Sequence, residues 1–187
     1  MDTVVSKRII TASEYHQMGE VGIIRPEERV ELINGEIITM SPIGSKHAAV
    51  LKRLMSWLFK NFSDQYEISA QDPIRIDNRN EPEPDLALLA KHPTTYFEQL
   101  PKATDVALII EVSDTTFLYD TTTKMELYAN AGIPEYWVVD IENVRVFGFS
   151  EPTEGTYQKS HTYQGQDSFE LHGLSLTVGD IIPKRKS

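Results

Sequence analysis

The chain has 187 residues, 40% of them hydrophobic, which is enough apolar material to bury the core of one domain. Its 18 basic and 28 acidic side chains give a net charge of −10, which weighs against nucleic-acid binding through a generally positive surface. Cysteine is absent, which excludes disulfides and thiolate metal sites. No apolar run approaches the ~20 residues of a membrane-spanning helix, and MDTVVSKRII lacks the apolar stretch of a secretory signal. We therefore expect one domain over residues 1–187, with no membrane segment and a cytoplasmic location.

The first predicted elements in chain order are short helical segments. Residues 11–18 predict a helix that Thr11 or Ser13 can cap, because a side-chain oxygen at this position accepts a hydrogen bond from the first helical turn. The segment 26–29 predicts a further helical turn.

A β-hairpin is predicted next. The segment VELINGEIITM alternates on both sides of Asn34-Gly35, and Asn-Gly between two alternating runs is the strongest short-range hairpin signal. This places strands at about 30–33 and 36–40, with Glu31 on the first.

The longest helical pattern runs from residue 44 to residue 62. Its apolar side chains recur on one face, which predicts an amphipathic helix packed on a core: Val50, Leu51, Leu54, Leu58 and Phe62. Lys46, Arg53 and Lys60 recur every seven residues on another face, and they form either a solvated surface or a stripe that contacts phosphates. His47 lies at the edge of the apolar face, where it is either a structural histidine held by a partner or an auxiliary residue of a site.

Strands are predicted on both sides of a proline-rich entry. YEISAQDPIRI predicts two short strands divided at Asp72-Pro73, and LALL predicts an apolar strand over 86–89. Asp85 stands at the mouth of that strand. Further short strands are predicted in VRVFGFS, TYQKSHTY and SFELHGLSLTVGDII, and KRKS is expected to be a frayed tail.

The segment from residue 107 to residue 140 predicts a strand, a helix and a second strand. ALIIEV is apolar enough to be buried on both faces and carries Glu111 near its end. A helix follows, with Asp120 and Lys124 four residues apart on one face, and it should stop at Ala131-Gly132, because glycine is the usual residue after a helix end. EYWVVD then predicts a parallel core strand, in which Tyr136 and Trp137 are structural.

Asp85, Glu111 and Lys124 are the candidate catalytic residues. Two carboxylates at neighbouring strand ends suit Mg²⁺ or Mn²⁺, which prefer hard oxygen ligands. A lysine beside such an ion is typical of phosphodiester hydrolysis, because the ammonium can orient water or stabilise charge in the transition state. From the residues alone, a surface ion pair between Asp120 and Lys124 is the favoured interpretation.

Several segments of the chain resemble one known family. PEPDLALL, LIIEVSDTT, the Asp120 to Lys124 spacing and ELYANAGIPEYWVVD are similar to the restriction-endonuclease-like family of small bacterial proteins within the PD-(D/E)XK nuclease superfamily. The resemblance covers about residues 25–147, and YANAGIPEYWVVD is its most specific part. It implies an α/β (α+β) fold in which a mixed β-sheet is flanked by helices.

The resemblance also implies roles for individual residues. Asp85 and Glu111 would bind Mg²⁺ or Mn²⁺, Lys124 would be the catalytic lysine, and Glu31 could add a carboxylate. In the superfamily the lysine stands two residues after the glutamate, a position that Ser113 occupies here, so Lys124 would have to fold back to the strand. Asp120 could orient Lys124 or reach the metal through water.

Three functions follow from these expectations. The first is a Mg²⁺-dependent endonuclease that cleaves DNA and could act as a homodimer, with Lys46, Arg53 and Lys60 in contact with the nucleic acid. The second is a non-catalytic binding or assembly module, which the net charge of −10 favours. The third is a metal-dependent hydrolase of small phosphate esters.

Overall fold

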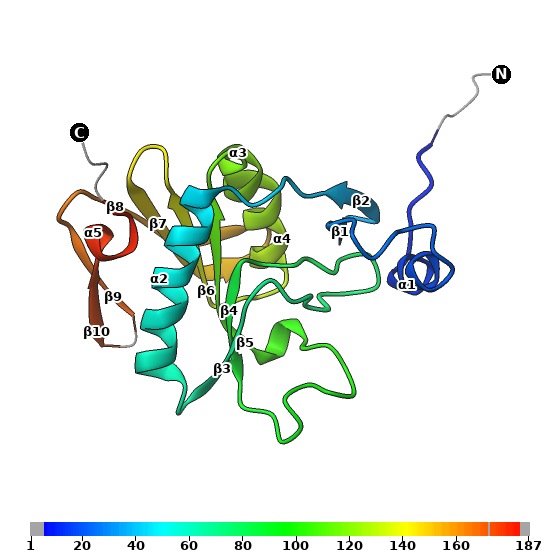
Figure 1. Ribbon diagram of the computed structural model, residues 1–187, viewed down its shortest axis with the longest axis horizontal. Coiled ribbons are helices and arrows are strands. Elements are labelled where there is room, and N and C mark those ends of the chain that lie inside the picture. Colours follow the sequence, from blue (N-terminus) through cyan, green and yellow to red (C-terminus); the bar gives the residue numbers. More distant parts are fainter. Residues whose placement is uncertain (1–5, 172, 184–187) are drawn as a thin grey trace.

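A mixed sheet of six strands forms the centre of the protein (Figure 1). The structure, a computed structural model, describes residues 6–171 and 173–183. The strands lie in the order β3 (Tyr66–Ser69), β4 (Leu86–Ala90), β5 (Val106–Ser113), β6 (Glu135–Asp140), β7 (Arg145–Thr153) and β8 (Thr156–Gln164). Strands β5 and β6 run parallel, and the other neighbouring pairs of this sheet run antiparallel. The predicted mixed sheet flanked by helices is confirmed.

One face of the sheet is covered by α2 (Ser45–Phe62) (Figure 1). The apolar stripe of this helix is buried at Val50, Leu54, Leu58 and Phe62, as its spacing predicts. The same hydrophobic cluster includes residues of the hairpin β9 (Ser168–Leu171) and β10 (Leu174–Thr177) and of the short helix α5 (Val178–Ile181).

The opposite face is covered by the connection between β5 and β6. This connection consists of α3 (Phe117–Tyr119), a π-helical turn (Asp120–Lys124) and α4 (Met125–Asn130). It ends one residue before the predicted stop, and Gly132 follows with a φ of 73°, a left-handed conformation that glycine adopts without strain.

Strand alternation decides which layer each residue of β5 meets. Leu108, Ile110 and Val112 belong to the cluster under α2, while Ile109 belongs to the cluster under α4. Glu111 alternates with Ile109, so its carboxylate points toward α4.

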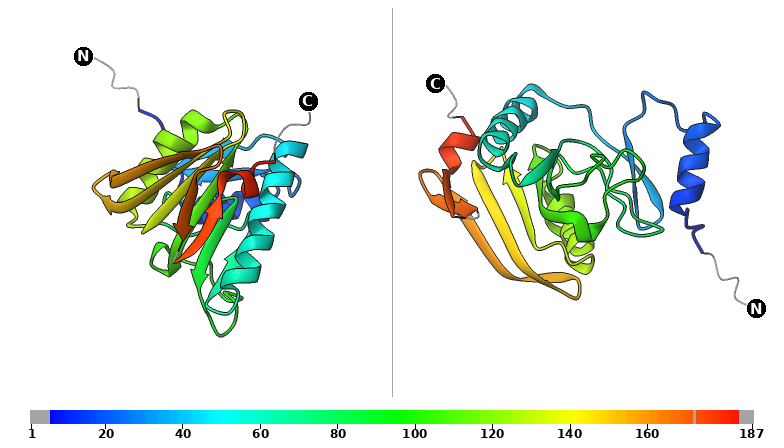
Figure 2. Two further views of the ribbon diagram at one scale, coloured as in Figure 1. Left: turned by 90° about the vertical axis from the view of Figure 1, so that its left-hand side faces the viewer. Right: turned by 90° about the horizontal axis from the view of Figure 1, so that it is seen from below.

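The N-terminal part lies at the end of the molecule opposite α5 (Figures 1 and 2). It contains α1 (Ala12–Glu20), capped by Thr11, and the two-stranded hairpin β1 (Val30–Ile33) and β2 (Glu36–Thr39). Asn34 and Gly35 turn the hairpin with φ values of 53° and 73°, as the Asn-Gly signal predicts. Backbone hydrogen bonds between Leu32 and Glu81 join the hairpin to the segment before β4.

Two smaller predictions are wrong. Residues 26–29 form no helix, and residues 73–76 contribute one isolated bridge, from Arg75 to Lys102, instead of a strand. Pro73 lacks an N–H group, which disfavours regular pairing there. The predicted tail KRKS lies outside the described residues. In residues 6–171 and 173–183, no helix is both long and apolar enough to cross a bilayer.

Candidate active site

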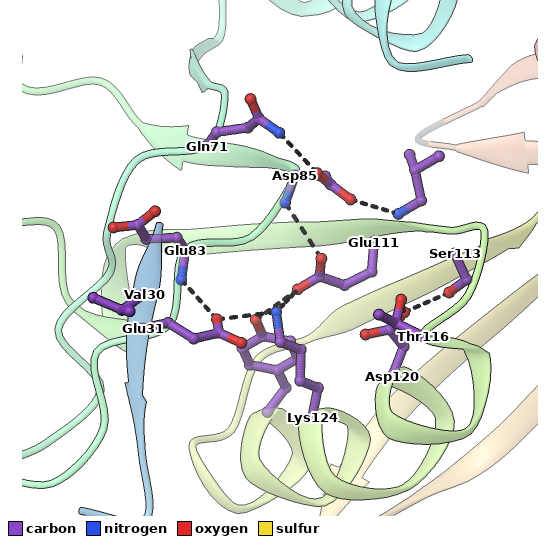
Figure 3. Close-up of polar contacts among 12 residues, drawn as sticks. Val30, Glu31, Gln71, Glu83, Asp85, Glu111, Ser113, Thr116, Asp120 and Lys124 are labelled. Carbon is purple, nitrogen blue, oxygen red and sulfur yellow. Dashed lines mark hydrogen bonds and ion pairs between the residues drawn. The ribbon is translucent and has the colours of Figure 1, made fainter. Parts of the chain in front are cut away.

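Asp85 and Glu111 meet at one edge of the sheet. Leu86 of β4 is in register with Ile110 of β5, so the residue before β4 lies beside the residue after Ile110. The backbone N–H of Asp85 donates to Oε2 of Glu111 over 3.4 Å, as Figure 3 shows. Both side chains are buried. The two predicted carboxylates are therefore neighbours.

The Asp85 carboxylate is held from three elements. His47 Nε2 of α2 lies 2.9 Å from Oδ1, Gln71 Nε2 donates to the same oxygen at 3.1 Å, and the N–H of Val112 donates to Oδ2 at 2.9 Å. Because a carboxylate only accepts, the His47 hydrogen bond requires a proton on Nε2. Burial raises the pKa of Asp85, but the contacts with His47, Val112 and Gln71 together outweigh burial, and the pKa lies below its ordinary value. His47 thus has a partner in the site.

Lys124 points into the protein and not into solvent. Its Nζ lies 3.0 Å from Oε1 of Glu111 and 3.1 Å from Oε2 of Glu31, and all three side chains are buried (Figure 3). Burial lowers the pKa of Lys124, but Glu111, Glu31 and Asp120 together outweigh burial and raise it above its ordinary value. The lysine therefore stays charged, and the alternative of a surface pair with Asp120 does not apply, because Asp120 is buried too.

A π-helical turn carries Lys124 back to the strand. The N–H of Met125 donates to the carbonyl of Asp120, five residues earlier, and the Tyr136 hydroxyl donates to the same carbonyl at 2.9 Å. A side chain that enters the hydrogen-bond ladder in this way is a recognised cause of irregular helix geometry. The turn buries Asp120 and Lys124 together.

Asp120 is fixed by hydroxyl groups and forms no ion pair with Lys124. Ser113 Oγ and Thr116 Oγ1 donate to its Oδ2 at 2.5 and 2.6 Å. Ser113, at the place of the superfamily's lysine, thus anchors the turn that presents Lys124. Asp120 acts here as a positioning group for the turn.

Glu31 enters the site from the N-terminal hairpin. Strand β1 presents it, and the N–H of Glu83 donates to its Oε2 at 3.2 Å (Figure 3). The same oxygen faces Lys124, so the hairpin supplies the second anion that holds the ammonium.

Negative charge exceeds positive charge in this site. Burial raises the pKa of Glu111 to about 8, and the charges of Asp85, Asp120 and Glu31 act in the same direction against the opposing effect of Lys124. The carboxylates line a cavity of about 330 Å³ that reaches the surface beside the N-terminus of α2. A divalent cation in this cavity would relieve the imbalance.

The site fits a divalent ion as a two-carboxylate site. In the described ranges, no three histidine, aspartate or glutamate side chains converge as a ready-made metal group. Mg²⁺, however, commonly binds through one or two carboxylates and keeps several waters. Asp85 and Glu111 supply such oxygens next to a cavity with excess negative charge. The donor set therefore fits Mg²⁺ or Mn²⁺.

The predicted basic stripe is exposed on α2. Lys46 lies in the first turn and forms a 3.4 Å ion pair with Glu142, while Arg53 Nη1 donates to the carbonyl of Asp180 at 3.1 Å. Lys60 is also exposed. The stripe is separate from the carboxylates and the lysine, and it begins next to His47.

Two residues of the site were missed by the sequence analysis. Gln71 binds Asp85, and the Tyr128 hydroxyl donates to Oε1 of Glu111 at 3.0 Å. A tyrosine instead of a phenylalanine at a core position of the helix was the available signal, because a buried hydroxyl needs a polar partner. No comparable signal marks Gln71, which reaches the site from a loop.

The family model described as Uma2, putative restriction endonuclease, matches residues 12–179. The chain belongs to the Uma2 family. This confirms the resemblance inferred from PEPDLALL and YANAGIPEYWVVD. No curated protein matches this Uma2 chain.

A solved structure has the fold of this Uma2 protein. It is described as a putative nuclease belonging to DUF820 from Anabaena variabilis, and it superposes with a TM-score of 0.71. The match covers 92% of this chain and 97% of the other, at 15% sequence identity. At this identity the likeness establishes the fold.

Proposed function

We propose that this Uma2 protein is a Mg²⁺- or Mn²⁺-dependent endonuclease that hydrolyses phosphodiester bonds of DNA. The observation that supports it is the buried Lys124 ammonium, 3.0 Å from Glu111, at the sheet edge that Glu111 shares with Asp85. The description of the family as a putative restriction endonuclease and of the Anabaena variabilis structure as a putative nuclease supports the nuclease part of this proposal.

Each residue of the site has a distinct role in this proposal. Asp85 and Glu111 would hold the metal ion, which polarises a phosphate oxygen and lowers the pKa of bound water. Lys124 keeps its proton, so it acts as a donor to the charge that develops on the phosphate and not as a general base. Glu31 fixes the ammonium, and His47 fixes the Asp85 carboxylate.

The basic stripe supplies the DNA contact. Lys46 and Lys60 are 14 positions apart on one helix, which corresponds to about 21 Å at 1.5 Å per residue. A stripe of this length can follow a phosphate backbone away from the cavity, although the whole chain carries a net charge of −10. Each such contact releases counterions and contributes affinity that decreases with salt.

A second candidate is hydrolysis of a small phosphate ester at the same site. The net charge of −10 and the cavity of about 330 Å³ favour it, because a small substrate needs no extended positive surface. The two functions share their catalytic residues and differ in the need for Lys46, Arg53 and Lys60.

Cleavage of plasmid, linear and single-stranded DNA, of RNA and of a chromogenic phosphodiester, each with Mg²⁺ or Mn²⁺, tests the proposal. We expect DNA cleavage by the wild type, and a loss of at least about 100-fold in Asp85→Asn and Lys124→Met, as for removal of a charge-stabilising group. Asp64→Asn and Lys91→Met alter exposed residues elsewhere and should match the wild type. Cleavage of the small ester alone would favour the second candidate, and activity in Asp85→Asn equal to wild type would reject both.

Cutting both strands of a duplex commonly takes two sites, and we therefore propose a homodimer on DNA. Light scattering of the free protein and of its complex with a short duplex measures this. A complex with one chain per duplex at saturating protein would reject the dimer.

A further inference from the structure

The catalytic cavity has too few free basic side chains to bind an anionic substrate. Its acidic lining residues are Glu31, Glu83, Asp85, Glu111, Asp114 and Asp120. Of the described basic residues, Arg29, His47 and Lys124 line the same cavity, but His47 is paired with Asp85 and Lys124 is held between Glu111 and Glu31. A phosphate group that enters the cavity therefore requires a further donor.

Arg29 is placed to be that donor. It precedes β1 and lies two residues before Glu31, so strand alternation directs both side chains to the cavity. The hairpin fixes its backbone, since the N–H of Met40 donates to the Arg29 carbonyl at 2.9 Å. Within residues 6–171 and 173–183, its half-buried guanidinium forms no hydrogen bond and no ion pair of 4.0 Å or less. Its charge acts on His47 and Glu83, which places it near the Asp85 side of the site.

Tyr119 supplies a second unused donor. It is the last residue of α3, directly before the π-helical turn, and it lines the cavity. Its hydroxyl is shut off from solvent and has no hydrogen-bond partner among the residues that the structure describes. Burial and the charge of Glu31 raise the pKa of Tyr119, so the hydroxyl keeps its proton and can donate. Buried hydroxyl groups are rarely left unpaired, so an acceptor is expected in the working state.

We propose that Arg29 and Tyr119 bind the phosphate group of the substrate from two sides of the catalytic cavity. Arg29 neutralises its charge, with the planar fork that suits phosphate oxygens, and Tyr119 donates one hydrogen bond from the Lys124 side. This inference rests on the proposed function for its substrate, because it assigns the phosphate-recognition residues of that same site.

Calorimetric titration with thymidine 5′-monophosphate in the presence of Mg²⁺ tests the assignment without any turnover. We expect the wild-type chain to bind the nucleotide, Arg29→Gln to bind it at least tenfold more weakly, and Tyr119→Phe several-fold more weakly. Arg25→Gln is the matched charge control, because Arg25 is exposed and paired with Glu28. Tyr96→Phe is the matched hydroxyl control, because Tyr96 donates to the Ala90 carbonyl outside the cavity. Both controls should bind like the wild type.

Thermal unfolding and single-turnover cleavage complete the test. Tyr119→Phe removes an unpaired hydroxyl, so its melting temperature should equal or exceed that of the wild type, and its cleavage rate should decrease about tenfold. Wild-type affinity for the nucleotide in both variants, or no binding by the wild type, would overturn the assignment. A wild-type chain that binds the nucleotide through Arg29 but cuts no nucleic acid would reject the nuclease and leave the phosphate site standing.

Discussion

Lys124 and Glu111 form a buried pair whose charges depend on the rest of the cluster. The two groups lie 3.0 Å apart, yet burial, together with the negative charges of Asp85, Asp120 and Glu31, raises the pKa of Glu111 to about 8. A single ammonium cannot balance these carboxylates. Ionised Glu111 should therefore reduce the stability of the metal-free protein, and a bound divalent ion should offset this electrostatic repulsion.

The pH dependence of stability follows from the raised pKa of Glu111. A carboxyl whose pKa is raised binds its proton more tightly in the folded than in the unfolded chain, so its contribution to stability is lost as pH rises from about 4.5 through about 8. We expect Glu111→Gln, which does not titrate, to be more stable than the wild type at pH 9 by on the order of 2 kcal/mol without metal. Chemical unfolding at pH 5 and pH 9 measures the difference.

Addition of Mg²⁺ tests whether a divalent ion offsets the excess negative charge around Glu111. It should stabilise the wild type at pH 9 and leave Glu111→Gln nearly unchanged, because an ion that binds only the folded state stabilises it. Glu98→Gln, at an exposed position, is the control and should follow the wild type. A Glu111→Gln protein that is less stable than the wild type at pH 9 would contradict the excess of negative charge.

The element that decides the position of the lysine is the π-helical turn. Its carbonyl at Asp120 accepts from both the Met125 N–H and the Tyr136 hydroxyl. Asp120 itself is anchored to Ser113 at the end of β5. Two strands of the sheet thus hold the turn, which gives the Lys124 side chain a fixed location.

Tyr136→Phe tests whether that turn matters for activity. Loss of the hydroxyl should lower the free energy of unfolding by about 1 kcal/mol and should reduce cleavage by about tenfold, because Lys124 loses its fixed orientation. Tyr157→Phe is a close control, since the buried Tyr157 hydroxyl also donates to a backbone carbonyl, that of Ile133, at 3.0 Å. An equal loss of activity in both variants would assign the effect to stability alone.

At the scale of the whole molecule, the proposed binding of DNA requires a local positive surface on an acidic chain. The stripe of Lys46, Arg53 and Lys60 runs along the exposed side of α2 and begins near the catalytic cavity. The triple change of these residues to glutamine should weaken DNA binding and reduce the slope of log affinity against log salt by up to about 0.9 for each lost phosphate contact.

A matched triple variant separates this effect from net charge. Lys91, Lys102 and Lys159 are exposed elsewhere on the molecule, and changing them to glutamine alters the total charge equally. Fluorescence anisotropy with a labelled duplex over a salt series measures both slopes. Equal slopes for the two triple variants would mean that the stripe of α2 does not bind phosphates.

The sequence by itself determined the elements that depend on short-range patterns. The hairpin at Asn34-Gly35, the amphipathic helix α2 and the strand around Glu111 follow from turn chemistry and apolar periodicity, which act between near neighbours in the chain. The proximity of Asp85 and Glu111 was also predictable, because both stand at ends of adjacent apolar strands.

Only the tertiary structure decided how distant groups share one cavity. Lys124 reaches Glu111 from a π-helical turn whose Asp120 carbonyl accepts a hydrogen bond from Tyr136 of another strand. Glu31 reaches Lys124 because the hairpin docks beside Glu81. Arg29 and Tyr119 were identified as candidate donors because both line the cavity and lack a partner in the described part of the chain. No local sequence pattern indicates that a side chain will lack a partner. Burial and charge balance depend on every element packed around a group, so they are properties of the folded chain.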